Sequence, residues 1–111
     1  MNEFIVHLTE LFTDFGPIRS RRMFGGYGIY HNELMFGLVA DDVLFLKTDK
    51  ALAHEMSEMG LEPFRFQKGD TLVTTSYYEA PPSIYDDDDD ATRWAQRAYA
   101  AAIAAKGAGN R

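Results

Sequence analysis

The segment between Arg21 and Tyr30 constrains this chain most, because glycines interrupt a run of residues that favour β-strands. The glycines are Gly25, Gly26 and Gly28. A glycine lacks a Cβ, so the backbone at these positions can turn, bulge or approach another strand closely. The aromatic and branched residues between them are typical strand formers. We expect a strand that enters at Ile18, is broken or bulged at the glycines and leaves through Ile29.

The size and charge of the chain limit what it can be. Its 111 residues fit one domain, and a hydrophobic content of 46% suffices for a core and excludes a disordered chain. The absence of cysteine excludes disulfides, thiolate catalysis and zinc sites built on cysteine. The net charge of −6 argues against nucleic-acid binding through the overall field, although Arg19, Arg21 and Arg22 form a local basic cluster.

The amino terminus and the hydropathy pattern predict a cytoplasmic protein. Met1-Asn2-Glu3 begins an amphipathic pattern and lacks the basic and apolar regions of a secretory signal. No apolar run approaches the roughly 20 residues that a membrane-spanning helix needs.

The first half of the chain predicts a helix followed by an antiparallel meander. Apolar residues at helical spacing from 4 to 15 indicate a helix that Asn2 caps and Gly16-Pro17 ends. In the bent strand that follows, Arg19, Arg21 and Met23 share one face, and an arginine lies on each face. Three strands with short polar turns between them make the meander. They cover residues 18–30, 34–40 and 43–47.

The second half predicts a helix, a hairpin and a last helix, which completes an α+β fold. Thr48-Asp49 begins the first of these helices, Gly60 ends it, and its apolar side consists of Leu52, Met56 and Met59. The hairpin joins residues 64–66 to residues 71–78. In the alanine-rich helix from Thr92 to Lys106, Trp94 anchors a packing face formed with Ala98, Ala101 and Ala105. We expect residues 1–106 to form one domain and residues 107–111 to fray.

Several motifs, taken in order, resemble the TfoX N-terminal domain family. The first motif is Arg22-Met23-Phe24-Gly25-Gly26-Tyr27-Gly28. Further matches are Met35-Phe36, Leu44-Phe45-Leu46-Lys47-Thr48-Asp49, Gly60 with Pro63-Phe64, Thr75-Ser76-Tyr77-Tyr78, and Trp94-Ala95. The resemblance covers the chain from about Phe4 to Ala105.

The resemblance implies a small bacterial protein connected with the regulation of natural competence. It implies an α+β fold of the kind also found in type III secretion chaperones and YjbR-like proteins. It brings no catalytic residue to this sequence. In the competence regulators a second, helical domain follows this one, so we expect a stand-alone N-terminal domain here.

Two alternatives remain for the arginines. Arg21 and Arg22 can grip a phosphate or an acidic partner, because a guanidinium offers two donors to an oxyanion. Alternatively, one arginine ties its strand to carboxylates elsewhere, such as the run Asp86–Asp90, because an arginine on a covered face needs a partner. The glycines do not lead into a helix N-terminus, which argues against a phosphate loop and hence a nucleotide site.

No other cluster predicts catalysis or a bound metal. The aspartate run lacks the glycine and glutamate of a calcium loop, so we expect Asp89 or Asp90 to cap the last helix. His7, His31 and His54 show no ligand spacing, and no serine lies in a nucleophile elbow. We therefore expect no cofactor, no metal and no enzyme.

The tyrosines suggest a contact surface. Tyr77 and Tyr78 point to opposite faces of their strand, so we expect one in the core and the other exposed. The exposed ring is available for a subunit contact, or both are ordinary sheet tyrosines without such a role. The leading hypothesis is a non-enzymatic module that binds a protein partner or itself as a homodimer, with Arg21, Arg22, Tyr27, Tyr77 and Tyr78 as the contact residues. The alternatives are a nucleic-acid-associated regulator that uses Arg19, Arg21 and Arg22, and a small metal- or ligand-binding protein.

Overall fold

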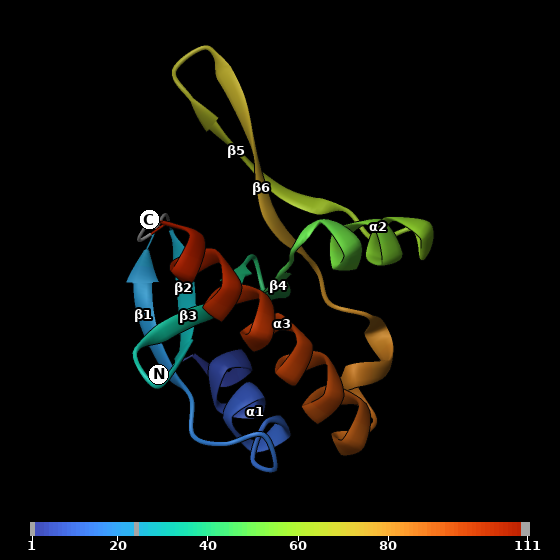
Figure 1. Cartoon of the computed structure of the whole chain (residues 1–111). Coiled ribbons are helices and arrows are strands. Elements are labelled where there is room, and N and C mark those ends of the chain that lie inside the picture. Colours follow the sequence, from blue (N-terminus) through green and yellow to red (C-terminus); the bar gives the residue numbers. More distant parts are fainter. Residues whose placement is uncertain (1, 24, 110–111) are drawn as a thin grey trace.

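The computed structural model describes residues 2–23 and 25–109, which form three α-helices, a short 3₁₀ helix and one six-stranded sheet (Figure 1). The helices are α1 (Glu3–Leu11), α2 (Lys50–Glu58), η1 (Pro82–Tyr85) and α3 (Asp88–Gly109). The strands are β1 (Arg19–Met23), β2 (Gly26–His31), β3 (Leu34–Ala40), β4 (Val43–Lys47), β5 (Pro63–Lys68) and β6 (Thr71–Glu79). The α+β class predicted from the sequence is confirmed.

The sheet is antiparallel throughout, in the order β1-β2-β3-β4-β6-β5. The prediction of one bent strand over residues 18–30, and so of a three-stranded meander, is wrong. This stretch forms two paired strands, with Met23 opposite Gly26 and a short turn between them. Gly25 lies in that turn at φ 77°, a conformation that glycine adopts without a steric penalty, so the chain reverses instead of bulging.

A bulge occurs one strand later, in β3. Ile29 pairs with Gly37 and Tyr30 with Met35, so Phe36 is the extra residue on β3. The bulge shifts the alternation of side chains by one position. Phe36 and Val39 therefore lie on the same face of the sheet, whereas Met35 and Leu38 lie on the other.

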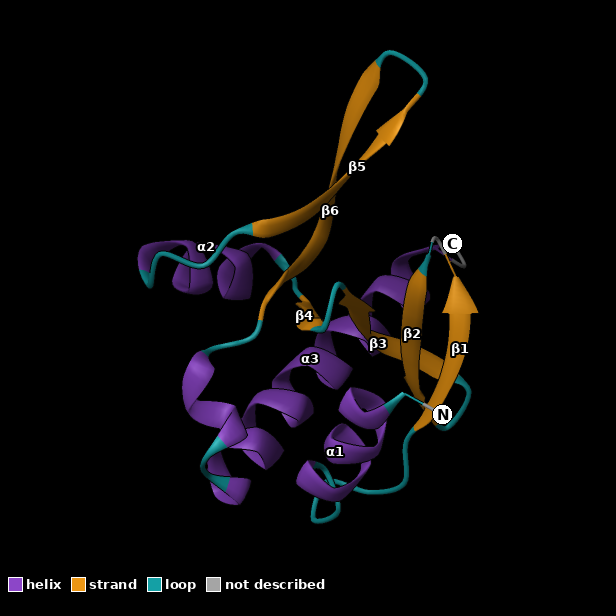
Figure 2. Ribbon diagram, turned by 180° about the vertical axis from the view of Figure 1, so that it is seen from behind, coloured by secondary structure: helices purple, strands orange, loops and turns teal. Residues whose placement is uncertain are grey.

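All helices pack against one face of the sheet. In the view of Figure 1, α3 passes in front of the strands and α1 lies below them, and Figure 2 shows the same strands from behind. The core contains Ile29, Phe36, Val39, Leu44 and Leu46 from the sheet. The helices contribute Ile5, Leu8, Leu11, Leu52, Met56, Ile84, Ala91, Trp94, Ala95, Ala98 and Ala102.

The first two helices begin at the caps that the sequence predicts. The side chain of Asn2 accepts a hydrogen bond from the Phe4 amide at 2.8 Å, and that of Asp49 accepts one from Leu52 at 2.8 Å. Their far ends differ from the prediction. α1 stops at Leu11 and continues as turns, and Met59 is 51% exposed because it lies beyond the last helical residue of α2.

The last helix begins earlier than expected and has a different cap. The carboxylate of Asp87 accepts hydrogen bonds from the amides of Asp89 and Asp90 at 2.9 and 3.1 Å, so the predicted cap at Asp89 or Asp90 is wrong. The helix extends to Gly109, three residues beyond Lys106, and Ala105 is exposed instead of packed. Residues 110 and 111 of the predicted tail lie outside the described chain. None of the helices in the described ranges is both long enough and apolar enough to cross a membrane.

Candidate functional site: the uncovered face of the sheet

The face of the sheet opposite the helices carries a continuous set of aromatic, methionine and basic side chains. We call it the uncovered face. The register of the strands places these residues on it: Arg19, Arg21 and Met23 of β1, Tyr30 of β2, Met35 and Leu38 of β3, Phe45 and Lys47 of β4, Tyr77 of β6, and Phe64 and Phe66 of β5. It also places one acidic residue there, Glu79 of β6, opposite Phe45. No helix of the described chain packs on this face.

The side chains of the uncovered face pack on one another. Leu38 is 4% exposed although it lies outside the main core, because neighbouring side chains on its own face cover it. The rings of Phe45 and Phe64 lie 5.2 Å apart, and Phe64 stacks on Phe66 at 6.3 Å. The face is therefore an ordered layer that continues from β1–β4 onto the β5–β6 hairpin. This hairpin projects from the rest of the sheet (Figure 2).

Two basic side chains lie over tyrosine rings on this face. The guanidinium of Arg21 is 5.3 Å from the ring centre of Tyr30, and the ammonium of Lys47 is 5.4 Å from that of Tyr77. Burial raises the pKa of Tyr77 above its usual value of 10.0, and the nearby Tyr30 raises it further. The Tyr77 hydroxyl is therefore protonated at neutral pH and can donate a hydrogen bond.

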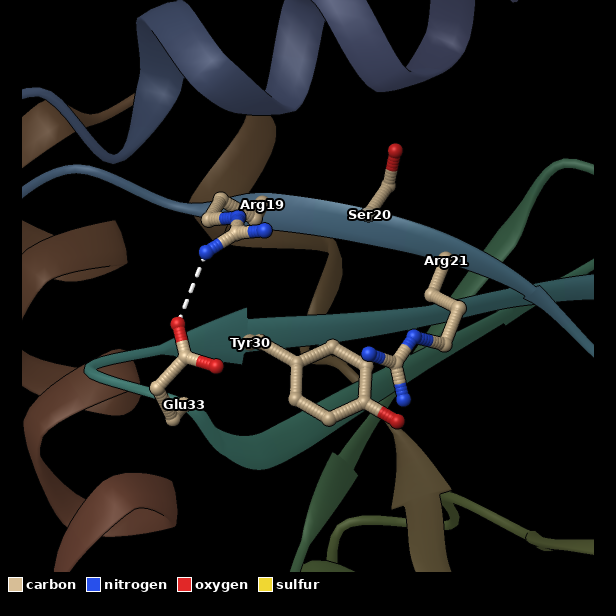
Figure 3. Close-up of a pocket in the computed structure, with 5 residues that line it drawn as sticks. All are labelled: Arg19, Ser20, Arg21, Tyr30 and Glu33. Atoms are coloured by element: carbon tan, nitrogen blue, oxygen red, sulfur yellow. Dashed lines mark hydrogen bonds and ion pairs between the residues drawn. The ribbon is translucent and has the colours of Figure 1, made fainter.

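A small hollow opens at the β1 end of the face (Figure 3). Its volume is about 160 Å³, and its lining residues are Arg19, Ser20, Arg21, Tyr30 and Glu33. Figure 3 shows the side chains of both arginines, Tyr30 and Glu33 gathered on one side of β1, whereas Ser20 points to the other side. A guanidinium of Arg19 donates to the Glu33 carboxylate at 2.7 Å. The hollow can therefore accept an acidic or hydrogen-bonding group beside Arg21.

In the described part of the chain, Arg21 and Arg22 are not paired with carboxylates as the structural alternative predicts. β1 is an edge strand whose first four residues are exposed, so an arginine on each face is solvated without a buried partner. The predicted link to the aspartate run is wrong, because Arg19 pairs with Glu33. Asp90 is bonded instead to Ser83 and Arg93. Among the described residues, neither Arg21 nor Arg22 has an ion-pair partner.

Charge is divided between the strands and the rest of the chain. The strands hold six of the 11 lysines and arginines but one of the 17 acidic residues, which leaves 16 acidic residues on helices, turns and loops. The charged strand residues are Arg19, Arg21, Arg22, Lys47, Arg65, Lys68 and Glu79. An acidic protein thus presents a basic sheet, which the overall charge of −6 conceals.

Comparison with known proteins identifies the family. A profile of the TfoX N-terminal domain matches residues 10–102. The chain belongs to the TfoX N-terminal domain family. It is similar to DNA transformation protein TfoX1 of Aliivibrio fischeri, with 34% identity over 77 residues that make up 66% of this chain and 37% of that protein. It is also similar to DNA transformation protein TfoX of Haemophilus influenzae, with 31% identity over 71 residues, 62% of this chain and 33% of that protein. The chain spans about a third of the length of these relatives in the matched regions.

The family motif places its residues at structurally distinct positions. Met23 lies on the uncovered face, and its sulfur covers Gly28 together with Tyr30 and Met35. Tyr27 lies on the opposite face and packs against the core, so its ring is not part of the uncovered face. Phe24 lies outside the described residues. The motif therefore builds the β1–β2 hairpin and contributes one face of it to the site.

The remaining predicted residues divide between the two faces. Tyr78 packs against the core, whereas Tyr77 lies on the uncovered face, as the alternation of the strand requires. Trp94 is 8% exposed in the core, with the Arg97 guanidinium 4.8 Å from its ring centre. Arg97 also donates two hydrogen bonds to Glu55, at 2.7 and 2.8 Å, and these bonds lower the pKa of Glu55. Trp94 is thus a structural residue that helps to dock α3 beside α2.

Sequence reasoning missed several residues of the site. Tyr30, Leu38, Phe45 and Lys47 received no role, although the alternation of Leu44 and Leu46 with Phe45 and Lys47 was visible in β4. That alternation indicates a strand with a second, accessible face. Within the described residues no group of three or more histidine, aspartate or glutamate side chains is placed to hold a metal.

Proposed function

We propose that this domain is a non-enzymatic interaction module that binds another protein through the uncovered face. The composition of that face carries the proposal. Arginine, methionine, tyrosine and phenylalanine are the residue types enriched at protein interfaces, and glutamate and aspartate are depleted there. Met23, Tyr30, Met35, Phe45 and Phe64 on this face are half-buried, so part of each side chain is open to a partner. Leu38 and the stacked phenylalanines give this surface a fixed shape before a partner arrives.

The chemistry of the hollow supports binding over catalysis. Its carboxylate, Glu33, is bonded to Arg19, and its serine points to the other side of β1. Tyr77, elsewhere on the face, has a raised pKa and does not act as a base at neutral pH. These groups can orient and hold a partner, but they do not form a nucleophile with an adjacent base.

The family suggests the setting in which this module works. Both relatives carry the name DNA transformation protein. We propose that this chain has a regulatory role connected with competence in the bacterial cytoplasm, and that protein–protein contacts carry it out. The likeness to secretion chaperones that the sequence implies agrees with such a role. A second copy of the chain is the alternative partner, in which case the module is a homodimer.

The test changes the centre of the uncovered face. A Lys47→Glu, Tyr77→Ala variant alters two side chains that lie against each other, and Lys106→Glu on α3 is the control for a changed exposed charge. Affinity purification from the native host identifies a partner, and calorimetry with the purified partner measures the affinity. Light scattering of the chain by itself tests self-association.

We expect wild type and the α3 control to bind the same partner, and the face variant to lose at least tenfold in affinity with an unchanged circular dichroism spectrum. Equal affinity of a folded face variant would refute the proposal. Retention of nucleic acid instead of protein by the wild type would support the alternative that rests on the β1 arginines.

A further inference from the structure

β1 is an open edge of the sheet. It pairs with β2, and the order of the strands places no described strand on its other side. The backbone donors and acceptors on that outer edge are therefore available to another chain. Extended segments commonly bind proteins by adding a strand to such an edge.

The side chains of β1 make this edge strongly basic. Three of its five residues are arginines, and it carries no acidic residue. Arg19 is bonded to Glu33, but both side chains of the pair are more than 70% exposed, so water and salt weaken the bond and another carboxylate can replace it. Arg21 lies over the Tyr30 ring, and its donors face the hollow (Figure 3).

The same charges exclude one occupant of the edge. If a second β1 were added antiparallel to the first, six guanidinium groups would crowd together, and like charges on neighbouring strands destabilise their pairing. A second copy of this strand is therefore disfavoured. An acidic strand has the opposite charge and meets no such repulsion.

The spacing of the arginines fits an extended acidic segment. Arg19 and Arg21 are two residues apart, so their side chains lie on one face about 6.6–6.8 Å apart along the strand. Alternate residues of an added strand have the same repeat. Carboxylates at alternate positions of an added strand therefore have the spacing of the two arginines.

We propose that β1 binds an acidic, extended segment of a partner protein by strand addition, with Arg19 and Arg21 recognising alternate carboxylates. The inference rests on the proposed interaction function and adds the chemistry of the partner. The other edge, β5, fits this role less well. Its first residue, Pro63, lacks an amide hydrogen, and it carries two basic residues against the three of β1.

The first experiment measures the recognition of charge. A fluorescent hexapeptide of alternating glutamate and valine is the probe, and its lysine–valine counterpart is the comparison, both followed by anisotropy in 50 and 200 mM NaCl. We expect the acidic peptide to bind and the basic peptide not to bind. Binding of the acidic peptide should weaken at least tenfold with Arg19→Glu, Arg21→Glu, and it should weaken with salt. Arg65→Glu, Lys68→Glu changes the net charge equally on the other edge and should leave the affinity within twofold of wild type.

The second experiment separates strand addition from simple ion pairing. Successive amides of an extended peptide point to opposite edges, so N-methylation of alternate residues blocks either the edge facing β1 or the solvent edge. We expect one methylated isomer to lose binding and the other to retain it. Equal binding of both isomers overturns the proposal, as does the absence of binding by the unmethylated acidic peptide.

Two outcomes distinguish this inference from the proposed function. A natural partner whose affinity falls with Lys47→Glu, Tyr77→Ala but not with the β1 reversal leaves the interaction module intact and overturns acidic-strand recognition. An oligonucleotide that binds more tightly than the acidic peptide and is lost with the β1 reversal also overturns it, because the edge then recognises phosphates.

Discussion

Alanine at Gly26 is expected to be the most disruptive alanine substitution in the glycine motif. A Cβ at this position overlaps the carbonyl oxygen of Val39 and lies 3.1 Å from its carbonyl carbon and 3.4 Å from the Cα of Ala40. These atoms belong to the backbone of β3, so a change of rotamer does not relieve the clash. The strands must separate where Tyr27 pairs with Val39. Overpacking by one methyl usually costs about 1–3 kcal/mol, and we expect at least the upper end of that range here.

Gly28 and Gly25 are matched controls in the same hairpin. A Cβ on Gly28 meets the sulfur atoms of Met23 and Met35 at 2.7 and 3.1 Å and the ring edge of Tyr30 at 3.0 Å. Because both thioethers can move, we expect a cost below about 1.5 kcal/mol. Gly25 has open space around it but sits at φ 77°, so alanine there costs about 1–2 kcal/mol in backbone strain.

Urea unfolding followed by the fluorescence of Trp94, the single tryptophan of the chain, compares the three variants. The expected order of destabilisation places Gly26→Ala first. A Gly26→Ala variant whose unfolding free energy lies within 1 kcal/mol of that of Gly28→Ala would refute the steric argument.

Three further predictions follow from burial, capping and titration. Phe36→Ala removes a side chain with 0% exposure and should lower the unfolding free energy by about 3–5 kcal/mol in calorimetry, and a loss under 1 kcal/mol would contradict its place in the core. Asp87→Ala removes the acceptor of two helix amides and should cost about 0.5–2 kcal/mol in thermal unfolding, whereas Asp86→Ala as control should cost less than half as much. Because the pKa of Tyr77 is raised in the folded state, the unfolded chain loses this proton first, and stability should fall as the pH rises above about 10; an equally steep fall in Tyr77→Phe would show that another group is responsible.

The local elements could be read from the sequence because they depend on neighbouring residues. Asn2 and Asp49 cap their helices through amides two or three positions along the chain, so the pattern of residue types identifies them. The cap of α3 was misplaced because any member of a run of five aspartates satisfies that pattern. Asp87 is the cap because η1 ends at Tyr85 and the helix begins at Asp88.

The sheet could be predicted less completely because pairing joins residues that are distant in sequence. The glycines indicated a break in the strand, but these residues are compatible with either a bulge or a reversal of the chain. The pairing of β1 with β2 shows that the chain reverses. The bulge at Phe36 left no local signal. It determines which side chains of β3 face the helices and which face away.

The sequence by itself determined the α+β class, the starts of the first two helices, the alternation of Tyr77 and Tyr78 and the family, because these depend on local preference and on residue types in order. The tertiary structure decided that β1 is an edge strand and that the helices leave one face of the sheet uncovered. It also placed six basic residues, from Arg19 to Lys68, on the strands, whereas most carboxylates lie on helices, turns and loops. Charge and exposure are properties of a surface, and a surface exists once the strands have paired and the helices have covered one side.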